Sequence, residues 1–386
     1  MGGDSCLRCC TRQLPLDYDT WYCIFQKLNS LIDQNSFGLT CVTFRNIQNS
    51  TSRRCLKIRC SNNNSIIDSF IIDKLLNRHS KLEKLTLGCY GCPHLTYSCL
   101  TPLLKYGSTL RSLNLDHCNS IRETQLKLIA SACPLLSVIS LTITSITDGG
   151  LQVLSKSCKY LNEVNLFGCY NITDNGIYFL IQNCHQLRAL IISQCGLIHG
   201  VGFRECSPTL ACLEAFNCDL DSKAVSRIVS GGGLEYLNLG TYGSRGSTVL
   251  EPIGLGFASK LKCLNIARCS LVDDDVIIKI SRGCPLLQEW NLTGCNMIWI
   301  PGWKSIGKYC QNLETLHVGY CIGRGLLYVG AGCKRLSVIV IEENQNTSEI
   351  IGLFKLQRED VEIKTKVPWH DARSRVFKTY EKYRAG

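Results

Sequence analysis

Apolar positions recur along the chain in a block that joins a short alternating stretch to a longer helical one. The stretch 158–177, CKYLNEVNLFGCYNITDNGI, places Val164 and Leu166 two residues apart among polar neighbours. Side chains two apart on a strand point to the same face, so this spacing predicts a short strand with one buried face. Ile177 and Leu180 follow at helical spacing. The block therefore predicts one strand followed by one helix.

The block occurs eleven times, at spacings of 23 to 28 residues. Its copies begin at Leu82, Leu110, Leu136, Leu161, Leu187, Leu210, Leu234, Leu261, Leu287, Leu313 and Leu336. The shared pattern, L-x-x-L-x-L-x-x-C, is similar to the leucine-rich repeat in its cysteine form. We therefore predict an α/β fold over residues 81–345. About eleven strand–helix repeats form a solenoid, with a parallel sheet on the concave face and helices on the convex face.

The 26 cysteines fall largely at two positions of the repeat, eight residues after the leading leucine and three residues before it. The first column holds Cys118, Cys169, Cys195, Cys218, Cys269, Cys295 and Cys321, with Cys89 offset; the second holds Cys133, Cys158, Cys184, Cys284, Cys310 and Cys333. Reach excludes a disulfide within one repeat. The strand segment between the two cysteines spans roughly 20 Å, whereas a disulfide needs Cα atoms within about 7 Å.

Cysteines of neighbouring repeats come within ~5 Å of each other, so distance alone does not exclude a bridge between repeats. The first residues, MGGDSCLRCCTRQLP, lack the apolar core of a secretory signal, so we expect a reducing compartment and reduced thiols. Zinc needs four converging ligands, whereas a ladder supplies a row. We therefore predict buried free thiols, with no metal and no other cofactor. In the post-strand column the thiol can hydrogen-bond the backbone of the tight turn.

Composition and charge narrow the function classes. The chain is 45% hydrophobic and 19% charged, which favours a well-packed globular protein. Of the net charge of +11, residues 1–60 and 353–386 carry +4 each, so no basic stripe marks the body. We therefore expect no nucleic-acid partner. No apolar run reaches the ~18 residues of a membrane span, and the sequence motifs of nucleotide-binding, hydrolase and zinc-protease sites are missing, so we expect no catalytic residues.

Residues 13–60 precede the repeats and carry apolar residues at helical spacings. Their order is Leu14-Pro15, Ile24-Phe25, Leu28, Ser36, Leu39, Cys41, Phe44-Arg45 and Ile47. This order resembles an F-box, with Phe44 where that family commonly has Trp. Together with the cysteine-type repeats, the chain resembles the F-box/LRR-repeat proteins, and most closely those of plants.

The resemblance implies a non-catalytic substrate receptor of an SCF-type E3 ubiquitin ligase, cytoplasmic or nuclear. The F-box would bind a SKP-type adaptor, and through it cullin and RING subunits. The solenoid would bind a protein that is ubiquitinated and then degraded by the proteasome. By the family motif, the adaptor-facing residues are Leu14, Pro15, Ile24, Phe25, Leu28 and Leu39. Several of these could instead only pack on the first repeat.

Residues between the apolar strand positions face the concave side and are the candidates for target binding. They include large side chains, which we expect to be exposed anchors. The candidates are Glu163, Asn165, Phe167, Phe216, Tyr236, Asn238 and Tyr242. Asn recurs at the central strand position and can also be a tolerated polar residue on a solvated face. Trp290 occupies an apolar strand position and is predicted to belong to the core.

The two ends lie outside the repeat pattern. We predict a disordered leader at 1–12, a helical F-box at 13–60, a connecting segment at 61–80, and a C-terminal cap with a basic tail at 346–386. An alternative function is a stand-alone repeat scaffold or inhibitor without a ligase. The sequence MGGDSC adds the possibility of membrane tethering through N-terminal acylation, although Cys6 departs from the myristoylation pattern.

Overall fold

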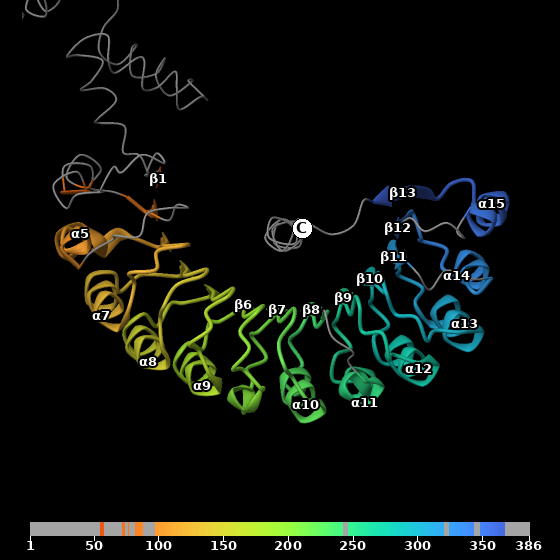
Figure 1. Ribbon diagram of the computed structural model, residues 1–386, viewed down its shortest axis with the longest axis horizontal. Coiled ribbons are helices and arrows are strands. Elements are labelled where there is room, and N and C mark those ends of the chain that lie inside the picture. The colour runs from red at the N-terminus through yellow and green to blue at the C-terminus, as the bar shows by residue number, and fades with distance from the viewer. Residues whose placement is uncertain are drawn as a thin grey trace, which may run out of the picture.

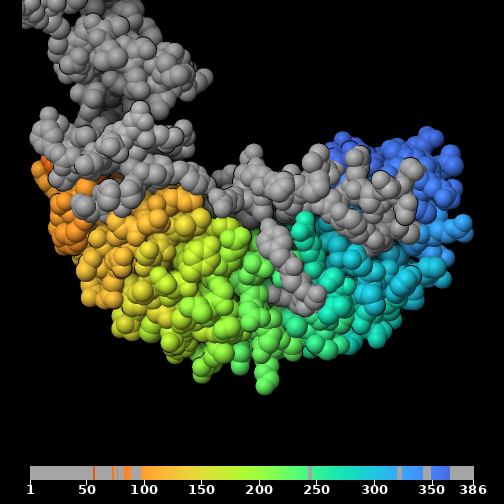
Figure 2. Space-filling model, in the orientation of Figure 1, coloured from red at the N-terminus to blue at the C-terminus, as the bar shows by residue number. Residues whose placement is uncertain are grey.

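A computed structural model of the chain describes residues 55–57, 72–73, 76, 82–87, 97–241, 246–319, 324–342 and 348–366. These residues form an arc in which one parallel sheet lines the inner side and helices cover the outer side (Figure 1). The sheet has thirteen strands, each paired with its neighbours in chain order. The predicted α/β solenoid with a concave parallel sheet is therefore confirmed, and neighbouring repeats touch along the arc (Figure 2).

Most strands are three residues long. They are β1 (Cys55–Lys57), β2 (Lys84–Thr86), β3 (Ser112–Asn114), β4 (Val138–Ser140), β5 (Glu163–Asn165), β6 (Ala189–Ile191), β7 (Cys212–Glu214), β8 (Tyr236–Asn238), β9 (Cys263–Asn265), β10 (Glu289–Asn291), β11 (Thr315–Gly319), β12 (Val338–Glu342) and β13 (Glu362–Lys366). Each of the eleven predicted blocks contains one of the strands β2 to β12.

The convex layer consists of short helices. They are α5 (Tyr97–Leu100), α6 (Leu103–Tyr106), α7 (Glu123–Ala132), α8 (Asp148–Ser157), α9 (Asp174–Asn183), α10 (Ser222–Ser230), α11 (Ser247–Leu250), α12 (Asp274–Gly283), α13 (Ile300–Tyr309), α14 (Leu326–Gly332) and α15 (Ser348–Gln357). The 3-10 helices η1 (Gly107–Thr109), η2 (Val201–Phe203) and η3 (Glu251–Leu255) are also part of this layer.

A continuous apolar core lies between the sheet and the helices. In the fourth repeat Val164 and Leu166 are 1% and 0% exposed, and Ile177 and Leu180 of α9 close over them. Burying one such side chain stabilises the fold by about 1.5–3 kcal/mol. No repeat closes this core alone, so stacking of neighbours supplies the stability. Trp290 is fully buried in this core, as predicted.

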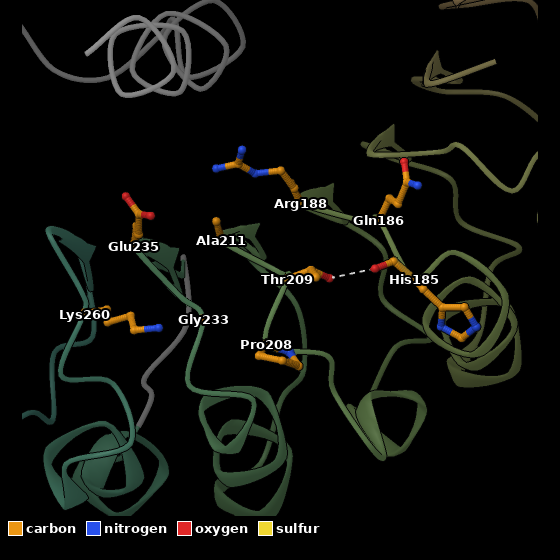
Figure 3. A pocket seen from close by; sticks show the side chains of 9 residues that line it. All are labelled: His185, Gln186, Arg188, Pro208, Thr209, Ala211, Gly233, Glu235 and Lys260. Atoms are coloured by element: carbon orange, nitrogen blue, oxygen red, sulfur yellow. Dashed lines mark hydrogen bonds between the residues drawn. The ribbon is translucent and has the colours of Figure 1, made fainter. Parts of the chain in front are cut away.

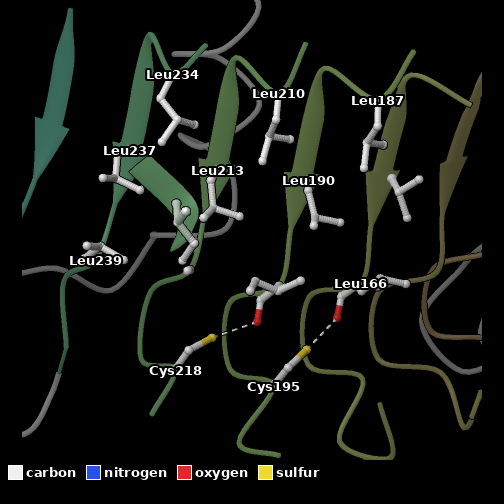
Figure 4. Close-up of a cluster of buried hydrophobic side chains, with 14 of the residues drawn as sticks. Leu166, Leu187, Leu190, Cys195, Leu210, Leu213, Cys218, Leu234, Leu237 and Leu239 are labelled. Carbon is white, nitrogen blue, oxygen red and sulfur yellow. Dashed lines mark hydrogen bonds between the residues drawn. The ribbon is translucent and has the colours of Figure 1, made fainter. Parts of the chain in front are cut away.

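The post-strand cysteines fasten each repeat to the one before it. Cys195 donates its S–H to the carbonyl oxygen of Leu166 at 3.1 Å, and Cys218 donates to that of Ile192 at 3.0 Å (Figure 4). The predicted contact with the backbone of the tight turn is present at Cys118, which donates to the carbonyl oxygen of Asp116 at 3.8 Å. In Cys195 and Cys218 the shorter contact reaches the preceding repeat. The residue before the cysteine adopts a left-handed conformation, as Gln194 does at φ 62°. That conformation turns the chain sharply out of the strand and directs the thiol back.

The second cysteine column ends the helices. Cys158 and Cys184 follow α8 and α9, and burial raises the pKa of each thiol to about 12. Every cysteine of the two columns that the structure describes is buried and lies outside any disulfide, so the predicted burial of these thiols is confirmed. At neutral pH such thiols are protonated and therefore unreactive.

The sheet extends beyond the predicted solenoid at both ends. β1 pairs with β2, although residues 55–57 were assigned to the F-box segment. β13 pairs with β12 and is preceded by α15, although residues from 346 onward were assigned to a cap and tail. The sheet therefore continues beyond residues 81–345 at both ends. Terminal repeats need only one buried face, so they depart from the leucine pattern by which the others are detected.

Candidate functional site

The concave face is built from three side-chain positions in each repeat. In the fourth repeat these positions hold Glu163 and Asn165 of β5 and Phe167 just after it, while Val164 and Leu166 point into the core. The parallel register sets equivalent side chains of neighbouring strands side by side, as Asn165 and Ile191 are. The concave face is therefore a set of rows in which side chains of successive repeats contact one another.

One group of hydrogen bonds, the Asp116 network, spans β3, β4 and the turns that follow them. It comprises Asn114, Asp116, Ser140 and Thr142. The Asp116 carboxylate accepts from Asn114 Nδ2 at 2.7 Å, from Ser140 Oγ at 2.6 Å and from the Thr142 backbone N–H at 3.0 Å. Asp116 itself is only half-buried. The carboxylate thus lies at the surface of the concave face while its partners hold it in place.

A second group, the Glu214 network, joins β6, β7 and β8 and comprises Ser193, Glu214, Tyr236 and Asn238. Tyr236 donates its O–H to Glu214 Oε2 at 2.7 Å, and Ser193 donates to Oε1 at 3.4 Å. Asn238 Nδ2 also donates to Oε1. Glu214 is 1% exposed, and its burial raises the pKa of the carboxyl to about 7, although the three donors lower it. Glu214 lies two residues before Phe216, at a position that the strand register assigns to the concave face, and it is buried there.

Small and apolar side chains surround this buried carboxyl. Ala189, Cys212, Tyr236 and Cys263 form an apolar cluster of their own on the concave face, separate from the core between sheet and helices. Their exposed fractions are all 6% or less. The pKa of Cys212 is raised well above its ordinary value, mainly by burial and then by the charge of Glu214. The centre of the concave face is therefore packed on both sides of the sheet.

The recurring asparagines have a structural role at the strand ends. Each accepts, through Oδ1, the backbone N–H of the residue two positions on. The pairs are Asn114 with Asp116, Asn165 with Phe167, Asn238 with Gly240, Asn265 with Ala267 and Asn291 with Thr293. The central asparagine thus satisfies a backbone donor where the strand leaves the sheet, which explains its recurrence.

The structure separates the predicted target-binding residues into two groups. Glu163 and Phe167 are partly exposed on the concave face. The expectation that Phe216 and Tyr236 are exposed is wrong, because they are 9% and 6% exposed. Asn165 and Asn238 are also buried and hydrogen-bonded within the face. A role for any of these residues in binding a target stays a prediction.

The other predicted positions lie outside the residues that the structure describes. They are Tyr242 and the adaptor-facing Leu14, Pro15, Ile24, Phe25, Leu28 and Leu39. Sequence analysis also missed Ser193, Cys212 and Cys263 as concave-face residues. The strand register alone identifies them, because Ser193 is equivalent to Phe167, and Cys212 and Cys263 are equivalent to Glu163.

Within the described ranges of the chain, no group of three or more His, Cys, Asp or Glu side chains converges to hold a metal ion. The helices of those ranges all lack the length and apolarity needed to span a membrane.

The sequence is similar to those of known proteins. No family model matches the sequence. The chain is 42% identical over 278 residues to F-box/LRR-repeat protein 12 of Arabidopsis thaliana, covering 69% of this chain and 70% of that protein. It is 26% identical over 270 residues to coronatine-insensitive protein homolog 1a of Oryza sativa, covering 64% of this chain and 44% of that protein.

Among solved structures, the yeast Rad7 and Elc1 complex contains a chain that is similar at 16% identity and a TM-score of 0.47, covering 90% of this chain and 92% of that one. The close relationship to the Arabidopsis protein agrees with the strand-by-strand repeat architecture and with the resemblance of residues 13–60 to an F-box. The chain belongs to the F-box/LRR-repeat protein family.

Proposed function

We propose that this chain is the substrate-recognition subunit of an SCF-type E3 ubiquitin ligase. The observation that carries the proposal is the relationship to an F-box/LRR-repeat protein over 70% of that protein's length. In this role the F-box segment binds a SKP-type adaptor, and the adaptor links the chain to cullin and RING subunits. The solenoid holds a target protein for ubiquitination, and the chain itself supplies no catalytic group. We place it in the cytoplasm or the nucleus.

The arc supports target binding on its inner side. A curved sheet presents many side chains to one partner at once, and extended concave faces are what repeat proteins use for binding. The side chains around Glu214 are buried against one another. We therefore assign contact with the target protein to half-buried side chains such as Glu163 and Phe167. Aromatic anchors commonly dominate such interfaces, which favours Phe167.

The adaptor assignment is tested by co-purification of the full chain with a SKP-type adaptor, followed by size-exclusion chromatography. We expect a stable complex that Ile24→Asp and Leu28→Asp each abolish, because a buried charge in an apolar interface is costly. The matched control is Leu104→Asp on α6, where the side chain is 59% exposed on the convex side. A complex that forms equally well with all three variants would favour the stand-alone scaffold.

A further inference from the structure

A hollow of about 420 Å³ lies at the edge of the sheet where β6 to β9 begin. Its lining includes Arg188, Ala211, Gly233, Glu235 and Lys260, contributed by four successive repeats (Figure 3). A volume of this size lies within the ~300–1,000 Å³ typical of ligand pockets. The hollow lies on the rim of the solenoid, outside the Glu214 network.

Two small residues open the hollow. Ala211 occupies the position that carries Arg188 in the preceding repeat and Glu235 in the following one, so the two long side chains flank an empty place (Figure 3). Gly233 lies in the turn before β8, and a Cβ atom there would overlap the carbonyl oxygen of Pro208. The close approach of two turns therefore requires glycine, and this leaves space between the larger side chains.

The charges around the hollow do not balance. Glu235 forms an ion pair with Lys262, at 2.8 Å between Oε2 and Nζ, so its carboxylate is already compensated. Arg188 and Lys260 are exposed and form no ion pair with any residue that the structure describes. The hollow thus presents an excess of positive charge, and the guanidinium of Arg188 extends over Ala211 (Figure 3).

Two backbone carbonyl oxygens in the lining of the hollow already accept hydrogen bonds from the sheet. The carbonyl oxygen of Arg188 accepts from the N–H groups of Ala211 and Cys212, and that of Ala211 accepts from Glu235 and Tyr236. These two carbonyl oxygens are therefore not available to an incoming chain. The charged groups that the hollow still presents to a partner are cationic side chains.

We propose that this hollow binds an acidic segment of a partner protein, with Arg188 and Lys260 contacting carboxylates and Ala211 and Gly233 providing the room. This inference rests on the proposed function only in assigning the segment to the target of the receptor. Arg188 is suited to the contact because guanidinium binds carboxylate through two parallel hydrogen bonds. Charge complementarity of this kind sets orientation and speeds association.

The experiment measures fluorescence polarisation of a labelled octaglutamate peptide with the full chain, alone and in complex with the adaptor. We expect saturable binding that weakens severalfold between 50 and 200 mM salt, because the contacts are solvent-exposed. Arg188→Glu combined with Lys260→Glu should weaken binding at least tenfold. Lys334→Glu reverses one charge, where the double variant reverses two, at an exposed site on the same edge before β12, and should leave binding within twofold.

A second variant separates the hollow from diffuse attraction along the edge. Ala211→Trp fills the space and keeps both cations, so we expect it to weaken binding as strongly as the charge reversal. Binding unchanged by Ala211→Trp, or equal losses in the double variant and in Lys334→Glu, would overturn the proposal. So would displacement of the peptide by low-millimolar inorganic phosphate, which indicates a small-anion site. Because the peptide assay works without adaptor, its result is independent of the ligase assignment.

Discussion

Two carboxylates on the same concave face have similar partners and different surroundings. Asp116 accepts from an asparagine, a serine and a backbone N–H, while Glu214 accepts from an asparagine, a serine and a tyrosine. Asp116 is half-buried, whereas Glu214 is 1% exposed. The neighbours of Glu214 in the strand register are Ile191 and Asn238, and both are buried as well. Burial, rather than the number of donors, distinguishes the two networks.

The difference shows how the surroundings act on two carboxylates that lie in adjacent rows of the concave face, since Glu214 is equivalent to Asn114 and not to Asp116. Near β3 the concave side chains are partly open to water, so a carboxylate there keeps part of its hydration. Around β7 the apolar cluster of Ala189, Cys212, Tyr236 and Cys263 excludes water from the carboxyl group. A buried charge is tolerated only when it is fully hydrogen-bonded or loses its ionisation. Glu214 has three donors and a raised pKa, so it is balanced between these two solutions.

The largest loss of stability is expected from removing the carboxylate that accepts the hydrogen bonds in each network. Glu214→Ala leaves the side-chain donors of Ser193, Tyr236 and Asn238 buried without their acceptor, at a cost of about 1–3 kcal/mol for each unsatisfied group. Some donors will relax, so we expect the free energy of unfolding to fall by about 3 kcal/mol in all. Asp116→Ala should cost about 1 kcal/mol, because water can replace the lost acceptor there. Urea denaturation followed by circular dichroism measures both, and equal losses would contradict the comparison.

A change of pH should alter the free energy of unfolding by a smaller amount per pH unit. The folded-state pKa of Glu214, about 7, lies above its ordinary value of 4.5. Between these values the folded chain binds more protons than the unfolded chain, so its free energy of unfolding falls as pH rises. The contribution is at most about 3 kcal/mol, or roughly 1 kcal/mol per pH unit. The pKa values of Cys212 and Tyr236 are raised well above their ordinary values, so within this network Glu214 titrates in that window.

The measurement compares the wild type with Glu214→Gln, whose side chain is similar in shape and does not titrate. Urea midpoints taken from pH 5 to pH 8 should show the wild type losing stability relative to the variant as pH rises. A difference between the two proteins that stays constant over this range would show that the carboxyl group keeps an ordinary pKa. The sign is informative by itself, because a carboxylate stabilised by its three donors alone would give the opposite slope.

The sequence is sufficient to predict the repeats, but it does not predict which side chains of the concave face are buried. Leu166 and Cys169 recur at fixed positions because each repeat must fill the same slot of a shared core, so register alone predicts eleven strands. Phe216 and Tyr236 occupy positions that register assigns to the concave face, and they do lie there. Their burial depends on which side chains flank them in two other repeats, about 25 residues away in the chain. β1 and β13 were missed because a terminal strand needs less of the leucine pattern.

The smallest loss of stability is expected from replacing two asparagines whose side chains accept the same kind of backbone hydrogen bond. Asn265 accepts from the N–H of Ala267 and is partly exposed, so Asn265→Ala should cost about 0.5–1 kcal/mol. Asn238 makes the equivalent contact with Gly240 and also donates to Glu214, so Asn238→Ala should cost about 2 kcal/mol.

A double-mutant cycle tests whether the larger cost of Asn238→Ala comes from its hydrogen bond to Glu214. In the Glu214→Ala background the cost of Asn238→Ala should fall to that of Asn265→Ala, because only the contact with the backbone remains. The same substitution at Asn265, two strands from Glu214, should cost the same in both backgrounds, since residues without shared partners behave additively. An Asn238 cost that is unaffected by Glu214→Ala would mean that the hydrogen bond between them contributes no net stability. The buried carboxyl group would then be held by Tyr236 and Ser193 alone.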